Sequence, residues 1–282
     1  MTLRERIEQL GRAADANTMP ADAEQVIHEL LDALERGSVR AATREADGTW
    51  SAVPWVKRGI LLGFRIGKLA DMSIPVMAEH RLSFVDKHTF PPREINVADG
   101  IRVVPGGSSI RRGAYVASGV VCMPPMYVNV GAYVGTGTMI DSHALVGSCA
   151  QIGERVHLSA AAQIGGVLEP VNASPVVIED DVLVGGNCGV YEGTVVRRKA
   201  VLAAGVVLTR GTPVYDLVNE RVLRGSTDAV LQIPENAVVV PGARAVSSEW
   251  GGSKGLALQT PVIVKYRDDK TDLATALEGW LR

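Results

Sequence analysis

The sequence predicts a mainly β protein built around a prism of stacked parallel β-coils, and three observations support this. Large aliphatic residues recur at every sixth position from about 104 to 214, a period that fits neither a helix nor a simple strand alternation. A column of mostly small residues runs two positions before them. The composition combines 30 glycines with 5% aromatic residues, as expected for many tight turns around a thin interior.

The aliphatic column forms two runs that share one phase. The step between them is 14 residues, which is one repeat plus eight, so a loop at about 167–175 is predicted to project without shifting the phase. The first run is Val104, Ile110, Val116, Cys122, Val128, Val134, Ile140, Val146, Ile152, Leu158 and Ile164, and the second is Ile178, Val184, Val190, Val196, Leu202, Leu208 and Val214.

The small-residue column, from Ala114 to Thr212, explains the shape of each repeat. Two inward positions separated by one outward residue match a short β-strand. The remaining residues are rich in glycine and make a turn. Three strand–turn units can close a triangular coil of 18 residues, and successive coils stack at about 4.8 Å. Repeats of this kind are typical of parallel β-helices.

Residues 1–100 are predicted to form an N-terminal α/β domain. Leu3, Ile7 and Leu10 have helical spacing, and "ADAEQVIHELLDALERG" carries a second apolar stripe that stops at a glycine. The segment "VKRGILLGFRIGKLA" favours a third helix. Between the second and third helices, Asp47-Gly48 is a hairpin turn signal that links two short strands.

The remaining domains are a β-helix over 101–215, including the loop at 167–175, and a C-terminal cap over 216–282. A cap is expected because an open end of the prism would expose sheet edges. The cap is predicted to contain two strands separated by a glycine-rich loop, followed by a helix. The apolar side of that helix would carry Leu273, Ala276, Leu277, Trp280 and Leu281.

The totals exclude several classes of function. A net charge of −2 argues against a nucleic-acid partner. Cys122, Cys149 and Cys188 lack CxxC spacing, so neither a disulfide framework nor a cysteine zinc site is expected. The N-terminus is charged throughout, unlike a signal peptide, and no run of about 18 apolar residues suggests a membrane span. We therefore expect a cytoplasmic protein.

Several stretches resemble one family of enzymes. "MYVNVGAYV", "GSCAQIG", "VHLS", "IGGVLEP" and "PVIVKYRDDKTD" are similar to tetrahydrodipicolinate N-succinyltransferases, and the likeness spans nearly the whole chain. The resemblance implies that the prism is a left-handed β-helix. It also implies transfer of a succinyl group from succinyl-CoA to an amine in lysine and diaminopimelate synthesis. Such enzymes are homotrimers with active sites in the grooves between neighbouring prisms.

Two residues match the family's acceptor site. Asp141, in "TMIDSH", corresponds to an aspartate that contacts the acceptor near its amine, where a carboxylate can orient an ammonium and help remove its proton. Its alternative role is a turn aspartate that bonds its own backbone. Arg102, in "IRVVP", corresponds to an arginine that binds a substrate carboxylate. Its alternative role is that of a solvated surface arginine.

The sequence departs from the best-known branch of the family at Gly189, where the resemblance implies a glutamate, so a catalytic carboxylate cannot be carried over there. Glu192, three residues later, is a substitute candidate. His143 stands where an aromatic residue is expected and could act as a general base near neutral pH. The alternative for His143 is a surface or subunit-interface histidine.

The CoA arm is expected to run beside coils of small residues. The candidate cofactor-binding residues are Gly165 and Gly166, in "SAAAQIGG", Gly205, in "AAG", and the lysines Lys254 and Lys265, which could meet phosphates or simply be surface lysines.

Other residues bear on the binding of the succinyl carboxylate, on a metal site and on a nucleophile. Arg111 and Arg112 are adjacent cations that could meet the succinyl carboxylate. No metal is predicted, since only His143 and His157 lie in the repeat and a zinc site needs three protein ligands. Cys149 is expected to pack rather than to act as a nucleophile.

Two rival functions remain open at the level of sequence. One is an acetyl-CoA-dependent transferase acting on the same or a related amino acid, since the sequence does not locate the group that would hold a succinyl carboxylate. The other is a non-catalytic β-helix scaffold, which would bind no CoA and would be indifferent to the change Asp141→Asn.

Overall fold

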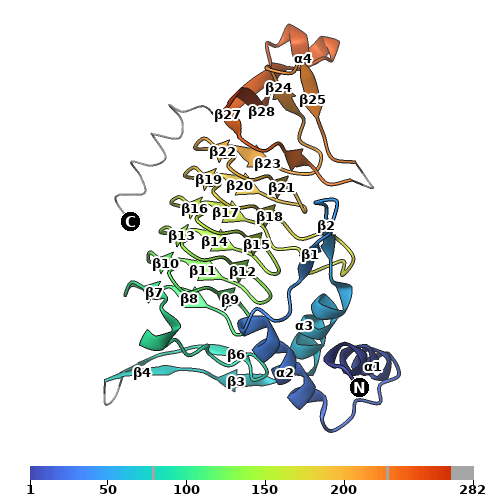
Figure 1. Cartoon of the computed structure of the whole chain (residues 1–282), viewed down its shortest axis with the longest axis vertical. Coiled ribbons are helices and arrows are strands. Elements are labelled where there is room, and N and C mark those ends of the chain that lie inside the picture. Colours follow the sequence, from blue (N-terminus) through green and yellow to red (C-terminus); the bar gives the residue numbers. More distant parts are fainter. Residues whose placement is uncertain (78–79, 227–228, 268–282) are drawn as a thin grey trace.

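The computed structural model describes residues 1–77, 80–226 and 229–267. A left-handed parallel β-helix forms the centre of the molecule, with an N-terminal domain of helices and hairpins beside its lower coils and a β-sheet on its upper end (Figure 1). This confirms the predicted fold class. None of the described helices is long and apolar enough to cross a membrane.

The prism has three walls of short parallel strands. The first wall contains β7 (Arg102–Val103), β10 (Val121–Cys122), β13 (Met139–Ile140), β16 (His157–Leu158), β19 (Leu183–Val184) and β22 (Val201–Leu202). The second wall contains β8 (Ser109–Ile110), β11 (Tyr127–Val128), β14 (Leu145–Val146), β17 (Gln163–Ile164), β20 (Gly189–Val190) and β23 (Val207–Leu208). The third wall contains β9 (Tyr115–Val116), β12 (Tyr133–Val134), β15 (Gln151–Ile152), β18 (Val177–Ile178), β21 (Val195–Val196) and β26 (Gln232–Ile233).

We call the turns between these walls edges. The first edge joins the first and second walls, the second edge joins the second and third walls, and the third edge returns from the third wall to the first. Partners in the ladder are 18 residues apart, as in Cys122↔Ile140. Across the loop the pair is Gln151↔Val177, which is 18 plus eight residues, so the predicted insertion preserves the phase. Both inward columns fill the core, and Ile140, Ile152 and Leu158 are fully buried.

The prediction was wrong at the two ends of the repeat. Val103, not Val104, pairs with Cys122, because the first coil contains one extra residue around Gly106-Gly107. At the upper end, Val214 is buried but does not continue the third wall; Ile233 pairs with Val196 in its place. The chain leaves the coil after β23 and returns at β26, so stacking continues past residue 215.

The predicted N-terminal helices and hairpin are confirmed. They are α1 (Leu3–Asp15), α2 (Ala23–Glu35) and α3 (Pro54–Ile66), with β1 (Ala42–Arg44) and β2 (Trp50–Ala52) joined by a turn in which Gly48 has a φ of 82°. Val130 and Cys149, on the second edge of the prism, belong to the same hydrophobic cluster as the helices. The domain is therefore packed on that edge.

A hairpin arm was not predicted from the sequence. It comprises β3 (Leu69–Asp71), β4 (Ile74–Met77), β5 (His80–Leu82) and β6 (Val85–Lys87), and it extends from the lower end of the molecule (Figure 1). A short 3-10 helix, Val97–Asp99, then leads into the prism. The arm exposes large apolar side chains such as Leu69 and Phe84. Strands of three or four residues without a buried face give no clear alternation, which is why the pattern failed here.

The C-terminal strands extend the first wall into a larger sheet. β27 (Ala237–Ala245) pairs with β22 and with β28 (Ala257–Tyr266), and β28 pairs with β24 (Val214–Asp216), which pairs with β25 (Arg221–Leu223). The loop between β27 and β28 holds the short helix α4 (Glu249–Ser253). The two predicted strands and their glycine-rich loop are confirmed, whereas the helix predicted after residue 270 lies outside the described residues.

Candidate active site

Each short strand of the prism presents one outward side chain between two inward ones. The third wall faces the N-terminal domain: Arg40 stacks over the ring of Tyr133 at 3.6 Å, and Trp50 Nε1 of the β1–β2 hairpin donates a hydrogen bond to Glu179, just after β18, at 3.0 Å. The outward residues of the first wall are Arg102, Val121, Met139, His157, Leu183 and Val201, and those of the second wall are Ser109, Tyr127, Leu145, Gln163, Gly189 and Val207.

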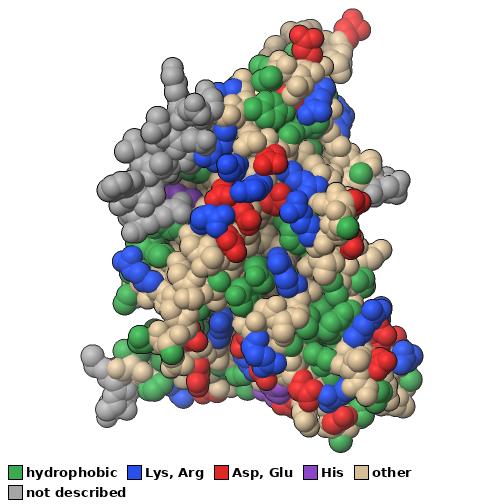
Figure 2. All heavy atoms as spheres, viewed as in Figure 1, with side chains coloured by type: hydrophobic (Ala, Val, Ile, Leu, Met, Phe, Trp, Pro, Cys, Tyr) green, Lys and Arg blue, Asp and Glu red, His purple; other side chains and the backbone are tan. Residues whose placement is uncertain are grey.

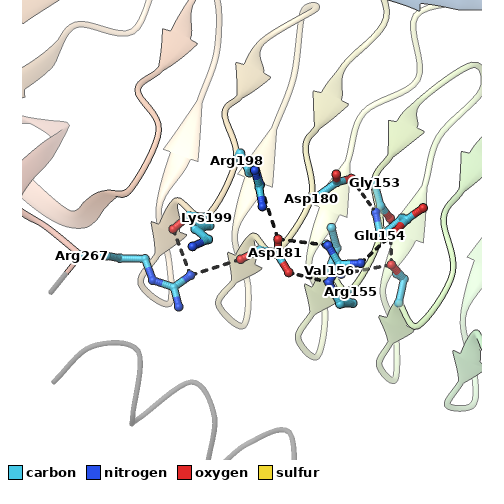
Figure 3. A network of polar contacts seen from close by, with 10 residues as sticks. Gly153, Glu154, Arg155, Val156, Asp180, Asp181, Arg198, Lys199 and Arg267 are labelled. Carbon is cyan, nitrogen blue, oxygen red and sulfur yellow. Dashed lines mark hydrogen bonds and ion pairs between the residues drawn. The ribbon is translucent and has the colours of Figure 1, made fainter. Parts of the chain in front are cut away.

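The third edge is occupied by a network of charges from successive coils (Figure 3). Arg155 donates to Asp181 at 2.7 and 3.1 Å, and Arg198 lies 3.6 Å from the same carboxylate. The guanidinium of Arg155 holds the pKa of the Asp181 carboxyl below its usual range. Figure 2 shows basic and acidic side chains intermingled over these upper coils. Because these cations and carboxylates neutralise one another, this edge is a poor place to bind an anionic substrate.

The first edge carries Asp141 next to a histidine that was not proposed as its partner. Asp141 Oδ2 lies 4.0 Å from His157 Nε2, and the two side chains are 32% and 16% exposed. Asp141 Oδ1 also accepts a hydrogen bond from the Ser142 amide at 2.8 Å. The sequence does hold the signal for this pair: His157 follows Met139 by one 18-residue coil, so it stands directly beside Met139 on the first wall, next to the corner that begins at Asp141.

His143 occupies the same corner as Asp141. Its side chain is exposed, its φ is 63°, and its amide donates to the Pro125 carbonyl at 2.5 Å. Gly131, Gly137 and Cys149 have the same left-handed conformation at six-residue intervals. Position 143 is therefore the recurring corner residue of the coil, two residues after Asp141 in the same turn. Among the described residues, no three His, Cys, Asp or Glu side chains form a group that could hold a metal ion.

A strip of small residues runs along the first edge above Asp141. The Asn187 amide donates to the Ala160 carbonyl at 3.0 Å, and the Gly205 amide donates to the Gly186 carbonyl at 2.9 Å, so the corners stack directly. Gly205 has a φ of 79°, which favours glycine. Apart from Asn187, the corner residues of this strip are serine, alanine or glycine, and at its upper end the Gln259 side chain donates a hydrogen bond to the Gly205 carbonyl at 3.3 Å. Between these side chains a ligand can approach the backbone closely.

The two candidate lysines belong to the C-terminal sheet and its loop, above the coils of the prism. Lys265 is exposed on β28 and is paired with Val238, which continues the outward column of the first wall. Lys254 is exposed at the end of α4. Arg102 is exposed at the lower end of the first wall, two strands below Met139, a rise of about 10 Å. Asp141, His143, Arg102, Gly205 and Lys265 therefore share one side of the prism.

The second edge carries the other candidates, in a groove of about 770 Å³. Gly165, Gly166 and Glu192 line it, and Glu192 Oε2 accepts a hydrogen bond from the Arg210 amide at 3.0 Å. The inserted loop forms one wall of the groove through Val167, Glu169, Pro170 and Ala173, and Tyr191, Thr209 and Arg210 complete the lining.

The loop is held in place by the N-terminal domain. Lys57 of α3 is fully buried and donates a hydrogen bond from Nζ to the Ala173 carbonyl. Burial lowers the pKa of the Lys57 ammonium. A buried lysine at this contact connects the wall of the groove rigidly to the helices.

The structure thus divides the predicted site residues into two groups. One group lies on the first wall and first edge, and the other lies in the groove at the second edge, with the second wall between them. Arg111 and Arg112 join neither group, because they form ion pairs with Asp86 and with Asp32 and Glu35 of the N-terminal domain. Sequence reasoning also missed Tyr191 and Arg210, which line the groove beside Glu192.

Comparison with known proteins agrees with this architecture. Residues 2–66 match a family model described as the N-terminal region of tetrahydrodipicolinate N-succinyltransferase, and residues 175–210 match one described as the hexapeptide repeat of succinyl-transferase. A solved structure from Campylobacter jejuni, described as a 2,3,4,5-tetrahydropyridine-2-carboxylate N-succinyltransferase, superposes with a TM-score of 0.51 at 18% identity. The match covers 85% of this chain and 62% of that one, and it supports the fold.

Curated relatives are similar over nearly their whole length. A 2,3,4,5-tetrahydropyridine-2,6-dicarboxylate N-succinyltransferase from Rhodopseudomonas palustris is 40% identical over 262 residues, covering 93% of this chain and 90% of the relative. The enzyme of that name from Nitrobacter hamburgensis is 41% identical over 268 residues, with the same coverage. The chain is therefore an acyltransferase that belongs to the tetrahydrodipicolinate N-succinyltransferase family, as the resemblance predicted.

Proposed function

We propose that this enzyme transfers a succinyl group from succinyl-CoA to the amine of open-chain or hydrated tetrahydrodipicolinate, which gives N-succinyl-2-amino-6-oxopimelate for lysine and diaminopimelate synthesis. The observation that carries this proposal is the position of Asp141. Its partly buried carboxylate faces His157 at 4.0 Å and stands at the foot of a strip of small residues. A proton acceptor for an amine and a path for a long thioester arm lie side by side.

The proposed chemistry is a direct transfer. Asp141 orients the acceptor ammonium and takes one of its protons, with His157 or His143 beside it as a second proton acceptor. The free amine attacks the thioester carbonyl, a carbon–nitrogen bond forms, and the carbon–sulfur bond then breaks. The attacking nitrogen loses a second proton as the amide forms, and the departing CoA thiolate takes up one proton to give the free thiol. Arg102, on the same wall, would hold a carboxylate of the acceptor.

The CoA arm is proposed to follow the first edge. The strip through Ala160, Gly186 and Gly205 leads from Asp141 towards the C-terminal sheet, where Lys254 and Lys265 would meet the phosphates. An arm in extended contact with the backbone needs side chains no larger than these. Donor binding at this edge would also position the thioester against the amine, which lowers the barrier to the transfer.

A homotrimer would bring the two groups of candidate residues together. Within one chain, Asp141 and Glu192 lie on opposite edges of the second wall, so they cannot contact one substrate. If the first edge of one protomer faces the second edge of its neighbour, then Gly165, Gly166 and Glu192 would close the site around Asp141. The outward apolar residues of the first and second walls, such as Tyr127 and Leu145, would pack between the prisms.

The succinyl-CoA donor and a cytoplasmic location belong to the same proposal. Succinyl-CoA is a cytoplasmic metabolite, and the three cysteines are free and buried, as is usual in a reducing compartment. We expect light scattering to give three times the mass of one chain. A monomer in solution would contradict the shared site.

The transfer itself is tested by product analysis. The purified enzyme is incubated with tetrahydrodipicolinate and an equimolar mixture of succinyl-CoA and acetyl-CoA, and the products are identified by mass spectrometry. The proposal predicts the N-succinyl product as the main species. A mainly N-acetyl product would move the enzyme to an acetylating activity, and no acylated product with either donor would contradict the transfer.

A further inference from the structure

Gly189 leaves a gap in the outward column of the second wall, and a neighbouring side chain fills it. A Cβ atom placed at Gly189 would lie 2.5 Å from Cε2 and 2.9 Å from the hydroxyl oxygen of Tyr191. A Cβ atom at Gly165 would lie 2.7 Å from Cδ1 of the same ring. These distances are shorter than real carbon contacts. The Tyr191 ring therefore rests on the bare backbone of both glycines.

The position of this ring is fixed by the coil. The Tyr191 amide donates to the Leu208 carbonyl at 2.9 Å, and the Tyr191 carbonyl accepts from the Thr194 hydroxyl at 2.7 Å. Gly189 pairs with Gln163 on one side and Val207 on the other. The phenol hydroxyl thus stands on the second wall, at the place that a side chain of residue 189 would otherwise occupy.

An arginine, Arg210, lines the same groove. Among the described residues, none makes a hydrogen bond or ion pair with the guanidinium of Arg210, and its Nε atom is buried without a partner. The Glu192 carboxylate accepts from the Arg210 amide, not from its side chain. Buried polar groups in proteins are normally satisfied. A ligand carboxylate in the groove would pair with the terminal nitrogens of this guanidinium, because guanidinium groups match carboxylates in geometry and charge.

We propose that Tyr191 and Arg210 form a carboxylate-binding site for the substrates of the reaction, with the Tyr191 hydroxyl at the place that a side chain of residue 189 would otherwise occupy. The inference rests on the proposed function. A tyrosine phenol carries a hydroxyl that can donate a hydrogen bond. It donates a hydrogen bond to an anion that a glutamate would repel. Two sources of carboxylate are available, the free end of the succinyl donor and the acceptor.

The test compares Tyr191→Phe and Arg210→Gln with wild type. Tyr191→Phe keeps the ring on the two glycines and removes only the hydroxyl. Kinetics are measured with succinyl-CoA and with acetyl-CoA, and binding of each donor and of the acceptor is measured by calorimetry. Loss of one hydrogen bond of ordinary strength corresponds to about a tenfold fall in affinity or in kcat/KM. Gly211→Ala is the control, because a Cβ atom there has nothing within 4 Å.

The two carboxylate sources give different results. If the site holds the succinyl end, both variants weaken succinyl-CoA about tenfold and leave acetyl-CoA unchanged. If the site holds the acceptor, both variants raise the KM and the Kd of the acceptor about tenfold with either donor. Gly189→Ala, which displaces the ring, is expected to weaken binding as much as Tyr191→Phe does. The double variant that combines Gly189→Ala with Tyr191→Phe is expected to bind no more weakly than either single variant.

Wild-type kinetics and affinities in both single variants, with an unchanged melting temperature, would overturn the inference. Absence of acylated product from the wild-type enzyme would instead overturn the proposed function, so the two failures are distinguishable. If Arg210→Gln does not fold, Tyr191→Phe decides the outcome alone.

Discussion

Gly147→Ala is a sharp test of how closely the coils stack beside the groove. A Cβ atom at position 147 would lie 2.2 Å from the Gly166 amide nitrogen and 2.6 Å from the Gly165 carbonyl carbon. Ordinary contact begins at 3.4 Å, so the neighbouring coil would have to move by about 1 Å. The obstacle is backbone held in a ladder, so no flexible side chain can move aside.

The expected cost follows from this overlap. Overpacking in a tight interior destabilises by about 1–3 kcal/mol. A chain of this size loses about 2–4 °C of melting temperature for each kcal/mol. Because the displaced backbone is Gly165-Gly166, which lines the groove, acyl transfer should fall as well.

The assay is a thermal melt together with steady-state kinetics, with Gly211→Ala as the matched control. Gly211 also lies in the upper part of the repeat region, but a Cβ atom there meets nothing within 4 Å. The control should melt and react like wild type. An unchanged melting temperature for Gly147→Ala would refute the stacking described here.

Three further predictions concern single side chains. His157→Gln should lower kcat at least about tenfold, and by more than His143→Gln does. The reason is that His157 lies 4.0 Å from Asp141 and is the more buried of the two histidines. Equal steady-state kinetics in the two variants would contradict the pairing of His157 with Asp141. Burial raises the pKa of the Cys149 thiol to about 12, so iodoacetamide should not modify Cys149 in the folded enzyme at pH 8, and mass spectrometry should find alkylation only after unfolding. Glu179→Gln should destabilise the enzyme by about 2 kcal/mol at pH 7, since burial, which raises the pKa of the Glu179 carboxyl, is outweighed by hydrogen bonds from Trp50, Arg198 and Arg197 that lower it. A lowered pKa means that this stabilisation is present above about pH 4.5 and is lost as the pH falls, so urea melts of wild type and variant should converge near pH 3 and differ at pH 7.

The prism could be predicted in detail because its period is set by backbone geometry. Ile140, Ile152 and Leu158 each occupy the inward position of one strand and are fully buried. The eight-residue insertion before Ile178 could be counted in the sequence. The errors occur where the period is broken by backbone that does not repeat. One extra residue near Gly106 moved the first inward position to Val103, and the excursion before Ile233 replaced Val214.

The candidate site was harder to predict because its contacts cross between coils and domains. Asp141 was identified from the resemblance. Its neighbour His157 can be found from the sequence only by counting the 18 residues of one coil from Met139. The contact of Tyr191 with Gly189 depends on the direction of a side chain at a corner, which the period does not fix. Lys57 is distant in sequence from the loop that it holds, and no pattern links the two.

The measurement that tests the account most directly is thiol release from succinyl-CoA and from acetyl-CoA, with and without tetrahydrodipicolinate, for wild type and Asp141→Asn. The account predicts release from succinyl-CoA that depends on the acceptor and falls at least about a hundredfold in the variant, with its melting temperature unchanged. A rate of thiol release that is the same without the acceptor, or that is unchanged in Asp141→Asn, would contradict the proposed transfer.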